Sequence, residues 1–110
     1  MTPTERDQLN AEYAVVCKGV KASSDLQKKM WKHEWQDANG DSFAEIPDFL
    51  SDEADAHRRM ASLILRHCFE VSQQEGSTVN LYFYGVRMFR GADLKEATMR
   101  ACIALKVMVM

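Results

Sequence analysis

The sequence predicts an α+β domain in which three helices pack on a small, mainly antiparallel sheet. Three observations lead to this fold class. Apolar residues recur at spacings of three and four in three segments, as in helices with one buried face. Short apolar runs flank turn residues such as Asn39-Gly40 and Gly85, as in hairpins. With 110 residues, 46% of them hydrophobic, the chain is expected to form a single domain over residues 1–110.

The first helix is expected to begin at Thr4, whose hydroxyl can cap it, with Glu5 and Asp7 at its positive end. It is expected to end between Gly19 and Ser24. Its buried face is predicted at Leu9, Tyr13, Val16, Cys17 and Val20.

An antiparallel hairpin is expected next, with Asn39-Gly40 as its turn and Pro47 after its end. Its strands are predicted over residues 30–36 and 42–46. Its buried side is predicted to hold Trp31, Trp35, Phe43 and Ile46.

Ser51 is expected to cap a second helix, with acidic residues in its first turn and basic residues, Arg66 and His67, in its last. The residues expected to face inward are Ala56, Met60, Leu63 and Ile64.

The last third of the chain is expected to form strands over 68–72, 79–84 and 86–90, followed by a helix from Leu94. Asp93 and Glu96 fit a capping box. This helix is apolar nearly all round, which predicts that it is largely buried. Its main stripe is Leu94, Ala97, Ala101, Leu105 and Met108, with Met99, Ile103 and Val107 on another face.

Several segments in this order resemble one known family. They are an opening helix over 9–16, Trp35 followed by Gly40, the run 46–52, the strands 69–71 and 81–84, and the alanine-rich helix within 92–105. Together they resemble the phage α/β/α (ABA) sandwich domain, a family of small phage and prophage proteins. Residues 21–32 are longer and more charged than the family pattern, and its acid-and-alanine run is shortened. The resemblance implies a phage or prophage origin and brings no catalytic residues.

The charge pattern gives the strongest functional hypothesis. The segment from Glu34 to Asp55 contains eight acidic residues and no lysine or arginine, so its charge is −8. Because the net charge of the whole chain is −2, the rest of the chain carries +6. A solvated face with helix-cap acids is one interpretation. The other is a docking surface for a basic partner, because acidic patches steer association with basic clefts. The eight acidic residues are Glu34, Asp37, Asp41, Glu45, Asp48, Asp52, Glu53 and Asp55.

These features predict a non-enzymatic accessory protein that needs no cofactor. It is expected to bind a basic host protein or complex through these carboxylates. The concrete form of the hypothesis is an inhibitor of a host defence, anti-CRISPR-like, or of a nucleic-acid-processing complex. Without a signal-peptide pattern or an apolar run of membrane length, a cytoplasmic location in a bacterial host is expected.

Residues 37–48 also allow a calcium-binding alternative, because their oxygen side chains follow the spacing of an EF-hand loop. Against it, Ser42 stands where that loop has an invariant glycine. The expected calcium ligands are Asp37, Asn39, Asp41, Glu45 and Asp48.

A third alternative is a homodimeric structural or regulatory phage protein, since the final helix carries apolar residues on more than one face. Direct nucleic-acid binding by Tyr82, Phe83, Tyr84, Arg87 and Arg90 is disfavoured, because the pI is near 5.9.

Other reactive side chains predict no chemistry. His33 and His57 are expected to be solvated or hydrogen-bonded. Cys17, Cys68 and Cys102 are too widely spaced for a zinc site and are expected to be buried thiols.

Overall fold

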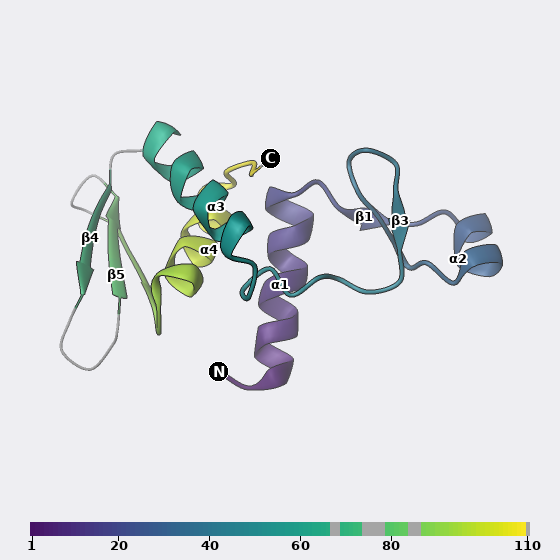
Figure 1. Cartoon of the computed structure of the whole chain (residues 1–110), viewed down its shortest axis with the longest axis horizontal. Helices are drawn as coiled ribbons and strands as arrows, with labels where there is room; N and C mark the ends of the chain where they lie inside the picture. Colours follow the sequence, from purple (N-terminus) through teal and green to yellow (C-terminus); the bar gives the residue numbers. More distant parts are fainter. Residues whose placement is uncertain (67–68, 74–78, 84–86, 110) are drawn as a thin grey trace.

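The computed structural model describes residues 1–66, 69–73, 79–83 and 87–109, with side chains for residues 1–65 and 89–109. The molecule is elongated, with extents of 50 × 29 × 21 Å (Figure 1). The α+β class is confirmed, but the described residues form four helices rather than three, and two small antiparallel sheets. The elements are α1 (Pro3–Cys17), β1 (Lys21–Ala22), α2 (Asp25–Trp31), β2 (Trp35–Gln36), β3 (Ser42–Phe43), α3 (Glu53–Arg66), β4 (Phe69–Gln73), β5 (Val79–Phe83), β6 (Arg87–Gly91) and α4 (Leu94–Leu105).

Helix α1 lies between residues 18–48 on one side and α3, α4 and the sheet β4–β5–β6 on the other (Figure 1). We call the described residues of 1–17 and 49–109 the main body, which includes α1, and residues 18–48 the distal lobe. In the main body, α4 packs against α1, α3 and the sheet β4–β5–β6. The hydrophobic core joins α1, α3, α4 and the last residues of the chain. It consists of Leu9, Tyr13, Cys17, Leu50, Leu63, Ala97, Met99, Ala101, Cys102, Val107 and Val109.

Helix α1 begins two residues earlier than predicted. Thr2 caps it by accepting a hydrogen bond from the Glu5 N–H (3.1 Å), and Pro3 occupies the first turn, where its missing N–H costs nothing. The predicted buried face is confirmed at Leu9, Tyr13 and Cys17, while Val16 is partly buried. Val20, beyond the end of the helix, is also buried.

The prediction of a strand from residue 30 is wrong in its first half. Residues 25–31 form α2, and Ser24 and Gln27 cap it with a reciprocal capping box. Trp31 therefore lies in a helix and is 64% exposed instead of packing inside a hairpin. The hairpin itself is confirmed, because β2 pairs with β3 and Trp35 lies opposite Phe43, but each strand is only two residues long. Its expected buried residues Trp35, Phe43 and Ile46 are partly buried.

Helix α3 is capped by Asp52, not by Ser51, because the Asp52 carboxylate accepts the N–H of Asp55 (3.0 Å). Ala56 and Leu63 face inward as predicted. The prediction for Ile64 is wrong, since this side chain is 63% exposed.

The three predicted strands of the last third are confirmed over residues 69–73, 79–83 and 87–91, while Tyr84 and Gly85 lie outside the described residues. Leu81 lies opposite both Val71 and Phe89 in this antiparallel sheet. Strand β6 approaches α4 closely at Gly91, where a Cβ atom would lie 2.5 Å from the backbone nitrogen of Ala97.

Helix α4 begins where predicted, with Asp93 accepting the Glu96 N–H (2.8 Å). The Glu96 carboxylate accepts the N–H of Ala92 rather than that of Asp93. Leu94 and Met108 are exposed, contrary to the prediction. The expectation that the helix is largely buried is confirmed, because its buried residues include Ala97, Thr98, Met99, Ala101 and Cys102.

Candidate functional site

The turn between β2 and β3 is closed by the Asp37 side chain. Its Oδ1 accepts hydrogen bonds from the N–H groups of Asn39 (2.9 Å) and Asp41 (3.0 Å). The Asp37 N–H donates to the Asp41 carbonyl at 2.9 Å. Gly40 has a φ of +91°, a backbone conformation that favours glycine. The predicted hairpin turn at Asn39-Gly40 is therefore confirmed.

The residues of the calcium alternative lie in and after this turn. Asp37 Oδ1 is engaged by the N–H groups of Asn39 and Asp41. Asp48, the last expected ligand, is bound to Arg6. Within residues 1–66, 69–73, 79–83 and 87–109, no group of three or more His, Cys, Asp or Glu side chains could hold a metal ion. The expected calcium ligands Asp37, Asn39, Asp41, Glu45 and Asp48 are spread along the hairpin and its return in this structure. Calcium binding by these residues stays a prediction.

The eight acidic residues divide by environment. Five of them, Glu34, Asp37, Asp41, Glu45 and Asp52, form no ion pair with any residue that the structure describes. All five are exposed except Asp37, which is partly buried. Four of the five belong to the hairpin and its flanks, while Asp52 caps α3. We call Glu34, Asp37, Asp41 and Glu45 the acidic hairpin.

Asp48 and Glu53 are partly neutralised. Asp48 pairs with Arg6 at 2.7 Å and accepts hydrogen bonds from Asn10 (2.8 Å) and Ser51 (2.8 Å). The Arg6 bond, helped by those from Asn10 and Ser51, lowers the pKa of Asp48 to about 2. Glu53 pairs with Lys95 at 2.8 Å. These contacts hold the end of the lobe against α1 and the start of α3 against α4.

Asp55 corrects the predicted partner surface, because it is fully buried. It accepts a hydrogen bond from the Tyr13 hydroxyl (2.7 Å) and ion pairs with Lys18 (2.9 Å) and Arg59 (2.6 Å). Burial alone would raise the pKa of Asp55, but the bonds from Tyr13 and Lys18 and the positive charges outweigh it, so this pKa is lowered. Burial and the Asp55 bond raise the pKa of Tyr13. No partner can reach Asp55, so it joins α1 to α3 instead.

Arg59 is a residue that sequence reasoning missed. It is fully buried, its Nη1 also donates to the Phe49 carbonyl (3.1 Å), and its guanidinium carbon lies 5.1 Å from the centre of the Tyr13 ring. Its Nε and Nη2 have no acceptor among the described residues. The signal was present as an acidic residue, Asp55, one helical turn before an arginine.

A polar hollow of about 470 Å³ lies between α1 and the acidic hairpin. Its acidic lining comes from Asp7, Glu45 and Asp48, beside the indole of Trp35. The carboxylates of the lobe thus continue onto α1 through Asp7. A basic side chain of a partner could enter this hollow and meet carboxylates beside an aromatic surface, to which cations are also attracted.

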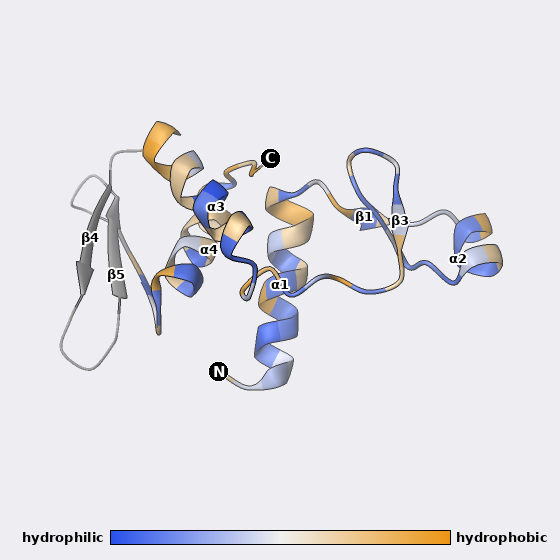
Figure 2. Cartoon of the chain, in the orientation of Figure 1, coloured by the Kyte–Doolittle hydropathy of each residue, from blue (hydrophilic) through white to orange (hydrophobic). Residues whose placement is uncertain are grey.

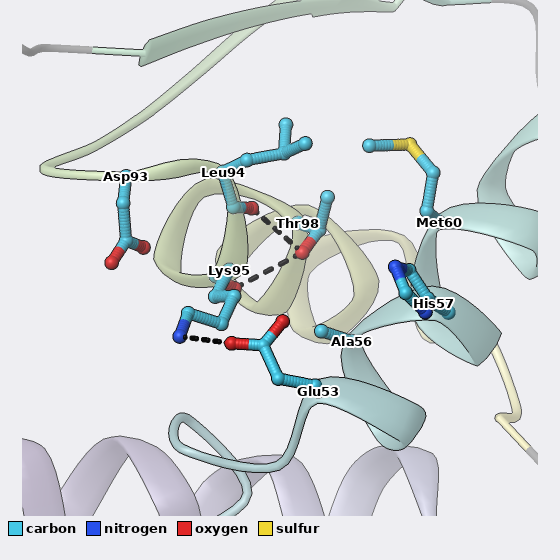
Figure 3. Close-up of a pocket in the computed structure, with 8 residues that line it drawn as sticks. All are labelled: Glu53, Ala56, His57, Met60, Asp93, Leu94, Lys95 and Thr98. Carbon is cyan, nitrogen blue, oxygen red and sulfur yellow. Dashed lines mark hydrogen bonds and ion pairs between the residues drawn. The ribbon is translucent and has the colours of Figure 1, made fainter.

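A second, apolar groove of about 300 Å³ separates α3 from the first turns of α4 (Figure 3). Met60 and Leu94 line one part of it, and the Glu53–Lys95 ion pair lies at its rim. The Thr98 hydroxyl lies 2.9 Å from the Leu94 carbonyl oxygen and 3.0 Å from that of Lys95, so its proton is engaged there. The groove offers apolar contact but no activated nucleophile among the residues that line it.

His33, His57, Cys17 and Cys102 have the environments predicted for them. The Nδ1 of His33 lies 2.8 Å from the Ser42 hydroxyl, and His57 is exposed on α3. Cys17 and Cys102 are fully buried, and burial raises the pKa of each thiol to about 12. Cys68 lies outside the described residues.

Two further predictions concern the sheet and the final helix. Tyr82, Phe83 and Arg87 lie on β5 and β6, and their side chains are outside the described part of the structure, so the expectation that they do not bind nucleic acid stays a prediction. The homodimer alternative stays a prediction: Met99 and Ala101 of α4 are buried in the same chain, whereas Leu94 and Met108 are exposed. None of the helices in the described ranges is long and apolar enough to span a membrane.

Exposed apolar residues on α2 were also missed, because its residues were divided between a loop and a predicted strand. Leu26, Met30 and Trp31 are each about two-thirds exposed, at 66%, 64% and 64%. The Ser24-x-x-Gln27 capping box was the signal that could have located this helix.

Comparisons of the chain with protein-family models, with curated proteins and with solved structures found no match.

Proposed function

We propose that this chain is a small phage or prophage accessory protein that binds a basic host protein or complex through the acidic hairpin and the adjoining hollow. The family resemblance of the sequence supports the phage or prophage origin. The observation that carries the binding proposal is a set of exposed carboxylates, Glu34, Asp41 and Glu45, without a cationic partner in the described residues.

The acidic surface favours a basic macromolecular partner over a small substrate. Carboxylates without ion pairs keep their charge available, and they accelerate encounter with a basic cleft more than they increase affinity. The hollow between α1 and the hairpin can receive one lysine or arginine side chain beside Trp35. In its concrete form, the proposal is that these carboxylates block a basic cleft of a host-defence or nucleic-acid-processing complex in the bacterial cytoplasm.

The test uses charge reversal, because neutralising Asp48 or Asp52 would disturb the fold. The protein is immobilised, and host lysate is passed over it at low and then high salt. The test variant is Asp41→Lys/Glu45→Lys. The control variant, Glu5→Lys/Glu12→Lys, changes the net charge equally at exposed positions of α1.

A basic protein retained at low salt and by the control variant, but lost by the hairpin variant, supports the proposal. The retained protein is then purified, and its affinity and association rate are measured against salt concentration. Equal retention by both variants overturns the proposal, because the carboxylates would then be an ordinary solvated face. Loss by both variants also overturns it, because it would reflect net charge rather than a site.

A further inference from the structure

The outer end of the distal lobe has an apolar face that nothing in the described residues covers. Helix α2 buries none of its residues, and its exposed Leu26, Met30 and Trp31 lie within two turns. Figure 2 shows hydrophobic colour on part of α2, at the end of the molecule away from the main body. A seven-residue helix is too short to be stable alone and normally depends on packing. Exposed tryptophan and methionine are enriched at the centre of protein interfaces. These features indicate a contact surface rather than a solvated helix.

The charge around this face is opposite to that of the acidic hairpin. Lys28 and Lys29 lie in the last turn of α2, and Lys32 is its C-cap. All three are exposed, and none forms an ion pair with a described residue. One lobe therefore carries a basic, apolar surface and an acidic surface that are complementary to each other.

We propose that the distal lobe binds a second copy of this chain. In the proposed pair, α2 of each copy packs on the acidic hairpin of its partner. A two-fold axis makes such an interface self-complementary, since each contact occurs twice. Helix α2 is only about 10 Å long at 1.5 Å per residue. A single contact would be smaller than the roughly 800 Å² per partner of a stable interface, so the pair needs both.

This pairing uses the same carboxylates as the proposed host contact but does not depend on it. Self-association would cover Asp41 and Glu45, and a basic host partner would compete with the second copy. Because association is tested with the purified chain alone, its failure is distinguishable from a failure of host-protein capture.

The test is sedimentation velocity and light scattering of the purified chain from about 1 μM to about 1 mM, a range that covers weak dimers. Two variants with reversed charges are compared. The tip variant, Lys28→Glu/Lys29→Glu, reverses the charge of α2, and the hairpin variant, Asp41→Lys/Glu45→Lys, reverses the charge of the acidic hairpin. Circular dichroism verifies that both are folded. The wild type is expected to form a salt-sensitive dimer, and each variant alone is expected to be monomeric. An equimolar mixture of the two variants is expected to dimerise, because both contacts again join opposite charges.

The apolar part of the contact is tested by Trp31→Ser, which is expected to weaken dimerisation at least tenfold without changing its salt dependence. A wild-type mass that stays monomeric over the whole range overturns the proposal. Dimerisation of either charge variant alone, or a mixture that stays monomeric, also overturns it. Vesicles of anionic phospholipid serve as a last probe: binding by monomeric wild type, lost with the tip variant, would assign the surface to lipid and overturn the proposal.

Discussion

Leu63 and Met99 in the main body are almost fully buried, whereas Met30 and Trp31 in the distal lobe each expose 64% of their surface. No residue of 18–48, all of which the structure describes, belongs to the hydrophobic core cluster. Val20 and Ser23 are the only buried residues in that range. Burial of apolar surface is the main source of folding free energy. We therefore expect the main body to determine global stability and the lobe to open locally at lower cost.

The largest expected effect comes from breaking the buried ion network of the main body. Asp55→Asn leaves Lys18 and Arg59 without their anionic partner in a buried site. It is expected to lower the free energy of unfolding by about 3–5 kcal/mol. Urea unfolding followed by circular dichroism measures this. Asp41→Asn in the lobe is the control and is expected to change little. Equal effects of the two substitutions would contradict the expectation that the main body, and not the lobe, determines global stability.

The pH dependence of unfolding provides a second readout for the same residue. The pKa of Asp55 is lower in the folded state, so its contribution is complete above the unfolded pKa of about 3.9. The contribution is lost as the pH falls below that value through the folded pKa. Wild-type stability is therefore expected to drop steeply below about pH 4, and Asp55→Asn is expected to drop less. Parallel acid curves would show that Asp55 is not the group responsible.

A matched pair of glycine substitutions gives the next largest effect. Gly91→Ala places a methyl group 2.5 Å from the backbone nitrogen of Ala97, so β6 and α4 must separate. It is expected to destabilise the main body by about 1–3 kcal/mol. Gly40→Ala also strains its backbone, at a φ of +91°, but this strain lies within the lobe. Hydrogen exchange resolved by residue should show protection lost throughout the main body for Gly91→Ala and only in residues 18–48 for Gly40→Ala.

A smaller and opposite effect is expected at the helix ends. Lys106 and Lys32 both adopt left-handed conformations, with φ of 53° and 55°, at the C-caps of α4 and α2. Glycine adopts this conformation without strain, so Lys106→Gly is expected to raise the free energy of unfolding by about 0.5–1 kcal/mol. Lys32→Gly is expected to leave the global unfolding midpoint unchanged. A stabilisation of the same size at Lys32 would mean that the lobe unfolds together with the main body.

The smallest expected effect is that of Trp31→Ser. Since this side chain is largely exposed on α2, the substitution is expected to change the free energy of unfolding by less than about 0.5 kcal/mol. The control is Leu63→Ala, which empties a fully buried position and is expected to cost about 2–5 kcal/mol. Thermal unfolding of dilute, monomeric protein compares the two. A large loss with Trp31→Ser would show that α2 is packed in solution.

The main body was more predictable from the sequence than the lobe for a physical reason. Leu9, Tyr13 and Cys17 repeat at helical spacing because one face of α1 is buried, and burial produces the periodicity on which the prediction depends. In the lobe, the apolar residues of α2 are exposed, so their spacing was not constrained by a core. Trp31, His33 and Trp35 are spaced two residues apart, as on one face of a strand, so both tryptophans were assigned to the same strand. In the structure, Trp31 is instead the last residue of α2.

The candidate site was predictable in position but not in composition. The turn at Asn39-Gly40 has a local signature, and the acidic hairpin lies where the charge pattern placed it. Asp52 and Asp55 are both aspartates and are only three positions apart. Asp55 is buried, whereas Asp52 is exposed. Its burial depends on Tyr13, Lys18 and Arg59, two of which lie about forty residues away in the chain. No local pattern carries that information.

The last residues of the main body have a consequence for the order of folding during synthesis. The Val109 N–H donates to the Cys17 carbonyl at 2.9 Å, and Val107 and Val109 are both in the core. Helix α1 is therefore synthesised before α4, Val107 and Val109, against which its buried face packs. Contacts of such long sequence separation form slowly, and exposed apolar surface on a nascent chain promotes aggregation. We therefore expect the apolar face of α1 to be the segment that chaperones protect until residue 109 has left the ribosome.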